Sequence, residues 1–345
     1  MKAAALMMLA LALAAHGQTY SARRVTVEGM EAIRLGDAAH SIEVTIFPGF
    51  GNNACEFKVK GRNILWNPFA SVAEAKAKPQ QIANPLLAPW ANRIDQDAYW
   101  INGRKYLLNP EFANFRRDPN GKPMHGLLQY AAWEVTRVEA NAREAVTTSR
   151  LEFWRRPDWM AQFPFAHNLE MTHRLRDGSL EIETVVENLA AESFPVSAGY
   201  HTYYQLFDAP RDEWRVHVAA RQEMVADRFL IPTGELRPVT LPDPVRLKDA
   251  QFDGGYTGLV RDGAGRATFW VRGKSQKISV AFGPRYPVAV LFAPDDPARR
   301  FICFEPMASP INAFNLVHAG RYQGVQTVSP GGSWRESFWI TPEGF

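Results

Sequence analysis

A strongly apolar candidate strand carries a single carboxylate near its end. Residues 300–307 read RFICFEPM, and a period of two places Phe301, Cys303 and Glu305 on one face. Burying an unpaired carboxylate costs free energy and raises its pKa, and a raised pKa makes a better base near neutral pH. We therefore predict that Glu305 is either a general base or one half of a structural ion pair with an arginine.

A histidine lies in an aromatic-rich segment at residues 197–206, which read SAGYHTYYQL. Alternation puts His201 and Tyr203 on one face of a strand, and Tyr200 and Tyr204 on the other. Histidine titrates near neutral pH and therefore suits proton transfer to a ligand oxygen. His201 is predicted to be a general acid, and the alternative is a core histidine bonded to a tyrosine hydroxyl.

Two further segments offer hydrogen-bonding groups in surroundings marked by proline or glycine. In residues 84–95 (NPLLAPWANRID), the prolines extend the backbone, and Asn92 and Arg93 supply donors that suit hydroxyl groups. His125 precedes Gly126, and a glycine lets the backbone approach a ligand closely. Each pattern is also typical of a structural role, so both interpretations stay open.

The sequence lacks the motifs of several other chemistries. It contains no dense metal-ligand spacing, no GxSxG nucleophile elbow and no phosphate-binding glycine loop that opens a helix. We therefore expect no metal and no cofactor, and we find no support for acyl transfer or nucleotide chemistry.

Short strands must position these residues. β-rich runs separated by turn residues are expected at 24–33, 41–47, 55–59, 133–138, 145–154, 168–175, 180–187, 194–201, 214–218, 267–271, 277–282, 288–292, 300–305 and 333–340. Residues 180–187 (LEIETVVE) alternate as a strand with one wet face should, directly after the turn signal Asp177-Gly178. Helical signal is sparse and is best at 71–78, before Pro79. The pattern predicts an antiparallel all-β fold.

Composition and charge narrow the function classes. The 345 residues are 46% hydrophobic and carry 39 basic and 36 acidic side chains, a net charge of +3 without runs of like charge. This distribution gives no support to nucleic-acid binding. The 21 phenylalanines and 10 tryptophans suffice for an extensive core or an aromatic-lined cleft.

The N-terminus reads as a targeting segment. Met1 and Lys2 precede an apolar run at 3–15, and small residues follow, which is typical of a secretory signal peptide over residues 1–17. We expect a periplasmic or secreted protein whose residues 18–345 form a single domain. No stretch approaches the roughly 20 apolar residues of a membrane span.

The chain has two cysteines, Cys55 and Cys303. Export would permit one long-range disulfide between them. Two separately buried thiols are favoured, because nothing in the sequence brings the pair together.

These clusters, in this order along an all-β chain, resemble the aldose 1-epimerase (galactose mutarotase-like) family. The resemblance rests on residues 92–95 (NRID), 100–109 (WINGRKYLLN), 125–126 (HG), 199–206 (GYHTYYQL), 226–235 (ADRFLIPTGE), 251–256 (QFDGGY) and 304–306 (FEP). It spans essentially the whole chain after residue 17.

The resemblance implies a large antiparallel β-sandwich, the galactose mutarotase-like supersandwich, with few short helices and a sugar cleft that requires no metal. It implies that Glu305 takes the proton from the C1 hydroxyl and that His201 protonates the ring oxygen. It also implies that the ring of a small-molecule monosaccharide is held by Asn92, Arg93, His125 and Asp253.

The sequence departs from the family pattern at two places. Residues 126–130 (GLLQY) lack the second glycine of many galactose mutarotases and the arginine of the hexose-6-phosphate branch, and Met307 stands where several relatives carry glutamine. We expect an aldose 1-epimerase of a free aldose. The alternatives are a non-catalytic carbohydrate-binding protein of this fold, a hexose-phosphate epimerase relative, and a polysaccharide lyase or hydrolase on a related sandwich.

Overall fold

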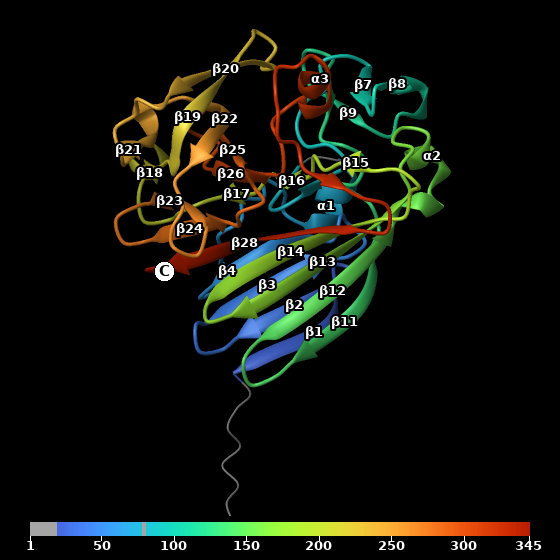
Figure 1. The fold of residues 1–345 in the computed structure, drawn as a ribbon. Helices are drawn as coiled ribbons and strands as arrows, with labels where there is room; N and C mark the ends of the chain where they lie inside the picture. The colour runs from blue at the N-terminus through green and yellow to red at the C-terminus, as the bar shows by residue number, and fades with distance from the viewer. Residues whose placement is uncertain (1–18, 78–80) are drawn as a thin grey trace, which may run out of the picture.

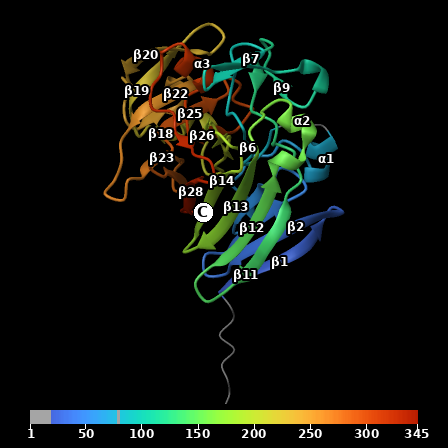
Figure 2. The same ribbon diagram turned by 45° about the vertical axis from the view of Figure 1, so that its right-hand side comes forward.

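The computed structural model describes residues 19–77 and 81–345, and nearly all of their regular structure is antiparallel β-strand (Figures 1 and 2). The signal peptide expected at residues 1–17 lies outside the described residues. Within the described ranges, no helix is long and apolar enough to cross a membrane.

A five-stranded sheet opens the fold. Its order is β1 (Tyr20–Val27), β2 (Met30–Asp37), β3 (Ile42–Phe47), β4 (Asn53–Val59) and β5 (Arg62–Asn63). The run expected as one strand at 24–33 is instead a hairpin, because the chain reverses at Glu28 and Gly29, which both have positive φ.

The longest sheet has nine strands. In spatial order they are β11 (Glu134–Ala140), β12 (Ala145–Glu152), β13 (His167–Arg176), β14 (Ser179–Asn188), β28 (Ser333–Glu343), β24 (Lys277–Phe282), β23 (Ala267–Arg272), β18 (Arg215–His217) and β21 (Val245–Arg246). The predicted turn at Asp177 and Gly178 joins β13 to β14. Strands β11 to β13 pack against β1 and β2, as the green and blue layers in Figure 1 show.

The third sheet has eight strands. Its order is β20 (Pro232–Pro238), β19 (Ala220–Ala226), β22 (Phe252–Leu259), β25 (Val288–Ala293), β26 (Ile302–Met307), β16 (Gly199–Tyr200) and β6 (Leu86–Leu87), and β17 (Tyr203–Tyr204) also pairs with β26. It packs on the second half of the nine-stranded sheet. Phe304 contacts Phe269 of β23 with ring centroids 6.1 Å apart, and Tyr200 contacts Phe338 of β28 at 4.8 Å. The fold is therefore the expected large antiparallel β-sandwich.

Short elements complete the chain. Two-stranded ribbons pair β7 (Ala98–Ile101) with β8 (Arg104–Leu107), β9 (Arg116–Arg117) with β10 (Pro123–Met124), and β15 (Phe194–Pro195) with β27 (Thr327–Val328). The helices are α1 (Val72–Ala77), α2 (Pro157–Met160) and α3 (Ala313–His318), and α1 lies within the predicted helix at 71–78. The run expected as one strand at 194–201 is divided, because β15 pairs with β27 whereas β16 pairs with β26 and β6.

The two cysteines are free and buried. Cys55 lies in β4 within the main core, and Cys303 lies in β26 in a separate cluster with Tyr203 and Phe301. The structure thus confirms two separately buried thiols.

Candidate active site

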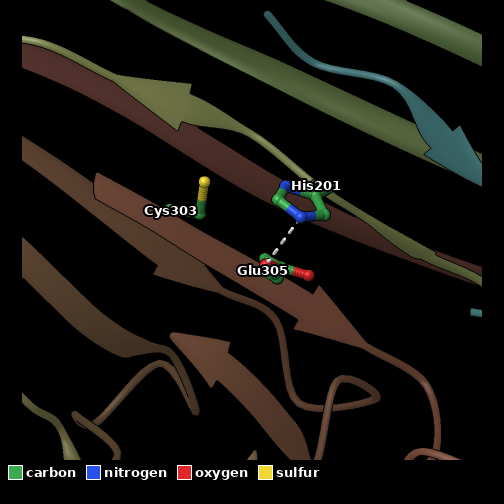
Figure 3. A group of neighbouring side chains, drawn as sticks. All are labelled: His201, Cys303 and Glu305. Atoms are coloured by element: carbon green, nitrogen blue, oxygen red, sulfur yellow. Dashed lines mark ion pairs between the residues drawn. The ribbon is translucent and has the colours of Figure 1, made fainter. Parts of the chain in front are cut away.

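The register of the eight-stranded sheet places His201 across from Glu305. Gly199 pairs with Met307, and Tyr203 pairs with Cys303. His201 is midway between Gly199 and Tyr203, and Glu305 is midway between Cys303 and Met307, so the two residues lie opposite each other. The Nε2 atom of His201 is 3.3 Å from Oε1 of Glu305, and both side chains are buried (Figure 3).

A glycine permits this close approach. A Cβ built on Gly199 would lie 2.2 Å from Sδ of Met307 and 2.7 Å from the carbonyl oxygen of Pro306. Heavy atoms do not approach so closely, so a side chain at this position would push β16 away from β26. Gly199 therefore helps to bring His201 to Glu305.

Alternation along β26 aims Glu305 away from the main core. Ile302 and Phe304 pack into that core, whereas Cys303 belongs to a separate cluster and Glu305 lines a cleft. Among the described residues, no arginine or lysine nitrogen lies within 4.0 Å of the Glu305 carboxylate, so the arginine ion pair considered as the alternative does not form.

The cleft has a volume of about 300 Å³. Its lining includes all six residues singled out in the sequence, namely Asn92, Arg93, His125, His201, Asp253 and Glu305. These residues come from β22, β26 and three loops that are distant in the sequence, and the fold brings them to one place.

Arg93 is oriented by a buried carboxylate. Its Nε donates to Oδ2 of Asp118 at 2.7 Å, and its Nη1 donates to Oδ1 of Asn92 at 3.2 Å. Burial raises the pKa of Asp118, but hydrogen bonds from Arg93 and from the backbone of Lys122 and Asn120 more than offset it and hold the pKa below its ordinary value. Asn92 and Arg93 therefore act together, and Asp118 fixes the guanidinium.

His125 is held in an uncommon backbone conformation. Its φ is +67°, in the left-handed region that non-glycine residues seldom adopt. A Cβ on the following Gly126 would lie 2.1 Å from the carbonyl oxygen of Ala88. The glycine therefore allows the backbone to pack against the segment that contains Ala88, rather than against a ligand. The ring of His125 meets that of His201 edge-on, with centroids 5.4 Å apart.

His201 and Glu305 share a poorly solvated environment. Burial lowers the pKa of His201 to about 3, and the charges of Arg116 and Arg93 lower it further. Burial, reinforced by Asp253 and opposed by Arg93, raises the pKa of Glu305 well above its usual range. Burial therefore disfavours the charged form of both groups.

The aromatic neighbour of His201 is the one that alternation predicts. Tyr203 stacks on its ring with centroids 4.5 Å apart, and the Tyr203 hydroxyl donates to Oε1 of Gln81 at 3.4 Å. His201 Nδ1 is buried without a hydrogen-bond partner. The alternative of a core histidine bonded to a tyrosine hydroxyl is therefore wrong.

Sequence reasoning missed several residues of the cleft. They are Trp66, Gln81, Arg116, Pro119, Met124, Val290, Phe292 and Arg299. Arg116 lies close enough to His125 and His201 for its charge to lower the pKa of both. Its place between residues 92–95 and His125 was a usable signal, whereas Trp66 and Gln81 reach the cleft only through tertiary packing.

The sequence matches the aldose 1-epimerase family over residues 32–341. Among curated proteins, it is 23% identical to the uncharacterized protein YihR of Escherichia coli (strain K12) over 232 residues, which cover 67% of this chain and 71% of that protein.

Solved structures share the fold. A galactose mutarotase-like protein from Clostridium acetobutylicum superposes with a TM-score of 0.82 at 22% identity, covering 95% of this chain and 99% of that one. A galactose 1-epimerase from Lactobacillus acidophilus NCFM superposes with a TM-score of 0.74 at 13% identity, covering 94% and 99%. Given the family match across most of its length and the shared fold, the chain belongs to the aldose 1-epimerase family.

Proposed function

We propose that this protein is an aldose 1-epimerase that interconverts the α and β anomers of a free aldose. The observation that carries the proposal is the 3.3 Å separation of His201 Nε2 and Glu305 Oε1 in the wall of a polar cleft. Ring opening of a cyclic sugar moves protons at two oxygens bonded to one carbon, the C1 hydroxyl and the ring oxygen. An acid and a base that serve two such neighbouring atoms must themselves be neighbours.

In the proposed reaction, Glu305 accepts the proton of the C1 hydroxyl while His201 donates a proton to the ring oxygen. The C1–O5 bond then breaks and leaves an open-chain aldehyde. Rotation about the C1–C2 bond presents the other carbonyl face, and the reverse transfers close the ring on it. General acid and general base catalysis each contribute typically about 10²- to 10⁴-fold.

Glu305 and His201 together need no net gain or loss of protons during this reaction. Ring opening needs a carboxylate and an imidazolium, whereas ring closure needs a carboxylic acid and a neutral imidazole. The two arrangements carry the same number of protons. Burial favours the uncharged one, so the bound sugar must stabilise the charged one before ring opening. A full turnover therefore returns the pair to its starting state with no net proton exchange with solvent.

The remaining polar groups of the cleft suit the ring hydroxyls. Asn92 and Arg93 are linked by a hydrogen bond, the His125 ring lies against His201, and the exposed Asp253 also lines the cleft. We propose that these four residues orient the ring so that C1 and the ring oxygen face Glu305 and His201.

A non-catalytic sugar-binding protein is the second candidate. The aromatic lining by Trp66, Tyr203 and Phe292 favours it, because sugar rings stack on such surfaces whether or not they react. A matched acid and base are unnecessary for binding alone, and their contact therefore favours the enzyme.

The deciding experiment follows anomer exchange of freshly dissolved α-glucose and α-galactose by polarimetry and NMR. The protein should accelerate exchange beyond buffer, and Glu305→Gln and His201→Asn should each abolish most of the acceleration. If the intact protein accelerates exchange of no aldose but binds sugars, the binding candidate replaces the enzyme. If both variants retain the full rate, the residue assignment is wrong.

We also propose that the protein is exported and acts in the periplasm or outside the cell, on the basis of the charged, apolar and small-residue order of residues 1–17. Fractionation of cells that express the full chain, with N-terminal sequencing of the recovered protein, tests this. Recovery of an uncut chain from the cytoplasm would contradict it.

A further inference from the structure

Cys303 has no part in the proposed reaction, yet its sulfur faces the acid–base pair. It lies two residues before Glu305 on the same face of β26 and directly across from Tyr203 of β17. One ligand atom from each of His201, Cys303 and Glu305 lies within 4.8 Å of the other two (Figure 3). All three side chains are buried.

The donor atoms of this group are left unsatisfied by the protein. Both carboxylate oxygens of Glu305 are buried without a hydrogen-bond partner, since the 3.3 Å contact with His201 lacks hydrogen-bond geometry. Buried polar atoms are normally hydrogen-bonded, so a carboxyl group without a hydrogen-bond partner, beside an imidazole and a thiol, marks a place where a ligand would be stabilised.

The donor set suits a borderline metal ion. Imidazole nitrogen, thiolate sulfur and carboxylate oxygen are the three ligand types of Zn²⁺, which binds them at about 2.0–2.3 Å. Donors at that radius lie closer together than 4.8 Å, so binding requires the side chains to move inward by an amount on the order of 1 Å.

Charge balance supports the same ligand. A divalent cation with one thiolate, one carboxylate and a neutral imidazole forms a complex without net charge, and such a complex is far cheaper to bury than an isolated ion. The thiol proton of Cys303 and the carboxyl proton of Glu305 leave to solvent as the metal–ligand bonds form.

We propose that His201, Cys303 and Glu305 form a site for Zn²⁺ or Cd²⁺, and that an ion bound there inhibits the protein. The metal occupies the lone pairs that Glu305 and His201 need for proton transfer. The inhibition rests on the proposed epimerase function, whereas the binding does not.

The test uses the full chain and two single variants, Cys303→Ala and the matched control Cys55→Ala. The control removes the other buried thiol, which lies in β4 and does not line the cleft. Cd²⁺ is added, and its thiolate charge-transfer band in the ultraviolet is recorded, while Zn²⁺ binding is measured by calorimetry. The unmodified chain and Cys55→Ala should bind one ion with the band, and Cys303→Ala should lose the band.

Anomer exchange is the second readout. Zn²⁺ should inhibit the unmodified chain and Cys55→Ala, whereas Cys303→Ala should keep its basal rate and need at least about tenfold more Zn²⁺, since even an outer-shell partner is worth about 10–100-fold in metal affinity. If Cys303→Ala does not fold, Cys303→Ser replaces it in both measurements, because serine is closer to cysteine in side-chain volume.

Equal zinc affinity in Cys303→Ala and the unmodified chain would overturn the proposal, as would the absence of a thiolate band at stoichiometric Cd²⁺. If no aldose is turned over, the band and the calorimetry still decide the metal site. Failure of the proposed function and failure of this inference are therefore distinguishable.

Discussion

Asp118 holds the guanidinium of Arg93 through a 2.7 Å hydrogen bond from Nε to Oδ2, and the carboxylate is fully buried beneath it. Asp118 itself does not line the cleft, whereas Arg93 does. The carboxylate therefore acts on a ligand only through the direction it gives to Arg93.

Substituting Asp118→Asn should raise KM for the aldose by about tenfold, because a hydrogen bond to a charged group is lost and Arg93 turns from its position. The turnover number should fall less than the affinity. Steady-state kinetics separates the two, and Asp97→Asn, which breaks an exposed pair with Arg117, is the matched control. Equal KM in all three proteins would contradict the positioning role.

Glu305 and His201 should behave as one unit. Each single variant, Glu305→Gln or His201→Gln, should lower the rate of anomer exchange by about 10²-fold or more. The double variant should fall little below the worse single variant, because either loss already stops concerted proton transfer. Glu235→Gln, the same change at an exposed position, should keep the full rate. Multiplicative losses in the double variant would show that the two groups act independently.

Gly199→Ala should impair catalysis by separating β16 from β26. The new methyl group meets Met307 and Pro306, so His201 moves away from Glu305 and the rate should drop by at least about tenfold, as small misplacements of catalytic groups do. Gly49→Ala is the control, since a Cβ there meets nothing within 4 Å and Gly49 does not have a positive φ. Full activity in Gly199→Ala would show that β16 and β26 can separate without lowering the rate.

Buried His173 should make the fold sensitive to acid. Burial lowers the pKa of His173 to about 3, and neither ring nitrogen has a hydrogen-bond partner. The folded protein keeps the ring neutral while the unfolded chain protonates it below about pH 6.5, so its contribution to stability is present above that pH and is lost as the pH falls toward 3.

Denaturant titrations between pH 7 and pH 4 test this contribution. His173→Phe, which cannot take up a proton, should reduce the pH slope of the unfolding free energy by up to about 1.4 kcal/mol per pH unit. An unchanged slope in the variant would mean that His173 is not neutral and buried in solution.

Cys55 and Cys303 should resist thiol reagents in the folded protein. Both are fully buried, and burial raises the pKa of each thiol well above its ordinary value. A chromogenic disulfide reagent should therefore titrate neither thiol at first, and both after denaturation without reductant. Fewer than two thiols in the denatured chain would reveal a disulfide.

Local patterns predicted correctly which side chains share a face of a strand. Period-two alternation placed Glu305 and Cys303 together, and His201 with Tyr203, because it depends only on the pleat of a strand. The hairpin at Glu28 and Gly29 was missed, since neither residue interrupts the β-rich composition around it strongly enough.

What the patterns could not supply was register. Nothing near His201 in the sequence indicates that β16 and β17 pair with β26, nor that Trp66 and Gln81 approach the same cleft. Such partners are chosen by packing between distant segments, and a single chain carries no local sign of them.

The ladder that sets His201 opposite Glu305 has a consequence for folding. The histidine lies in the middle third of the chain and the glutamate in the last third, so they meet only after β26 has joined β16 and β17. Long-range pairing of this kind is slow relative to local structure. A chain emerging from synthesis therefore cannot bring His201 to Glu305 until β26 has been made. Under the proposed function, the return of activity after denaturation would time the completion of this sheet.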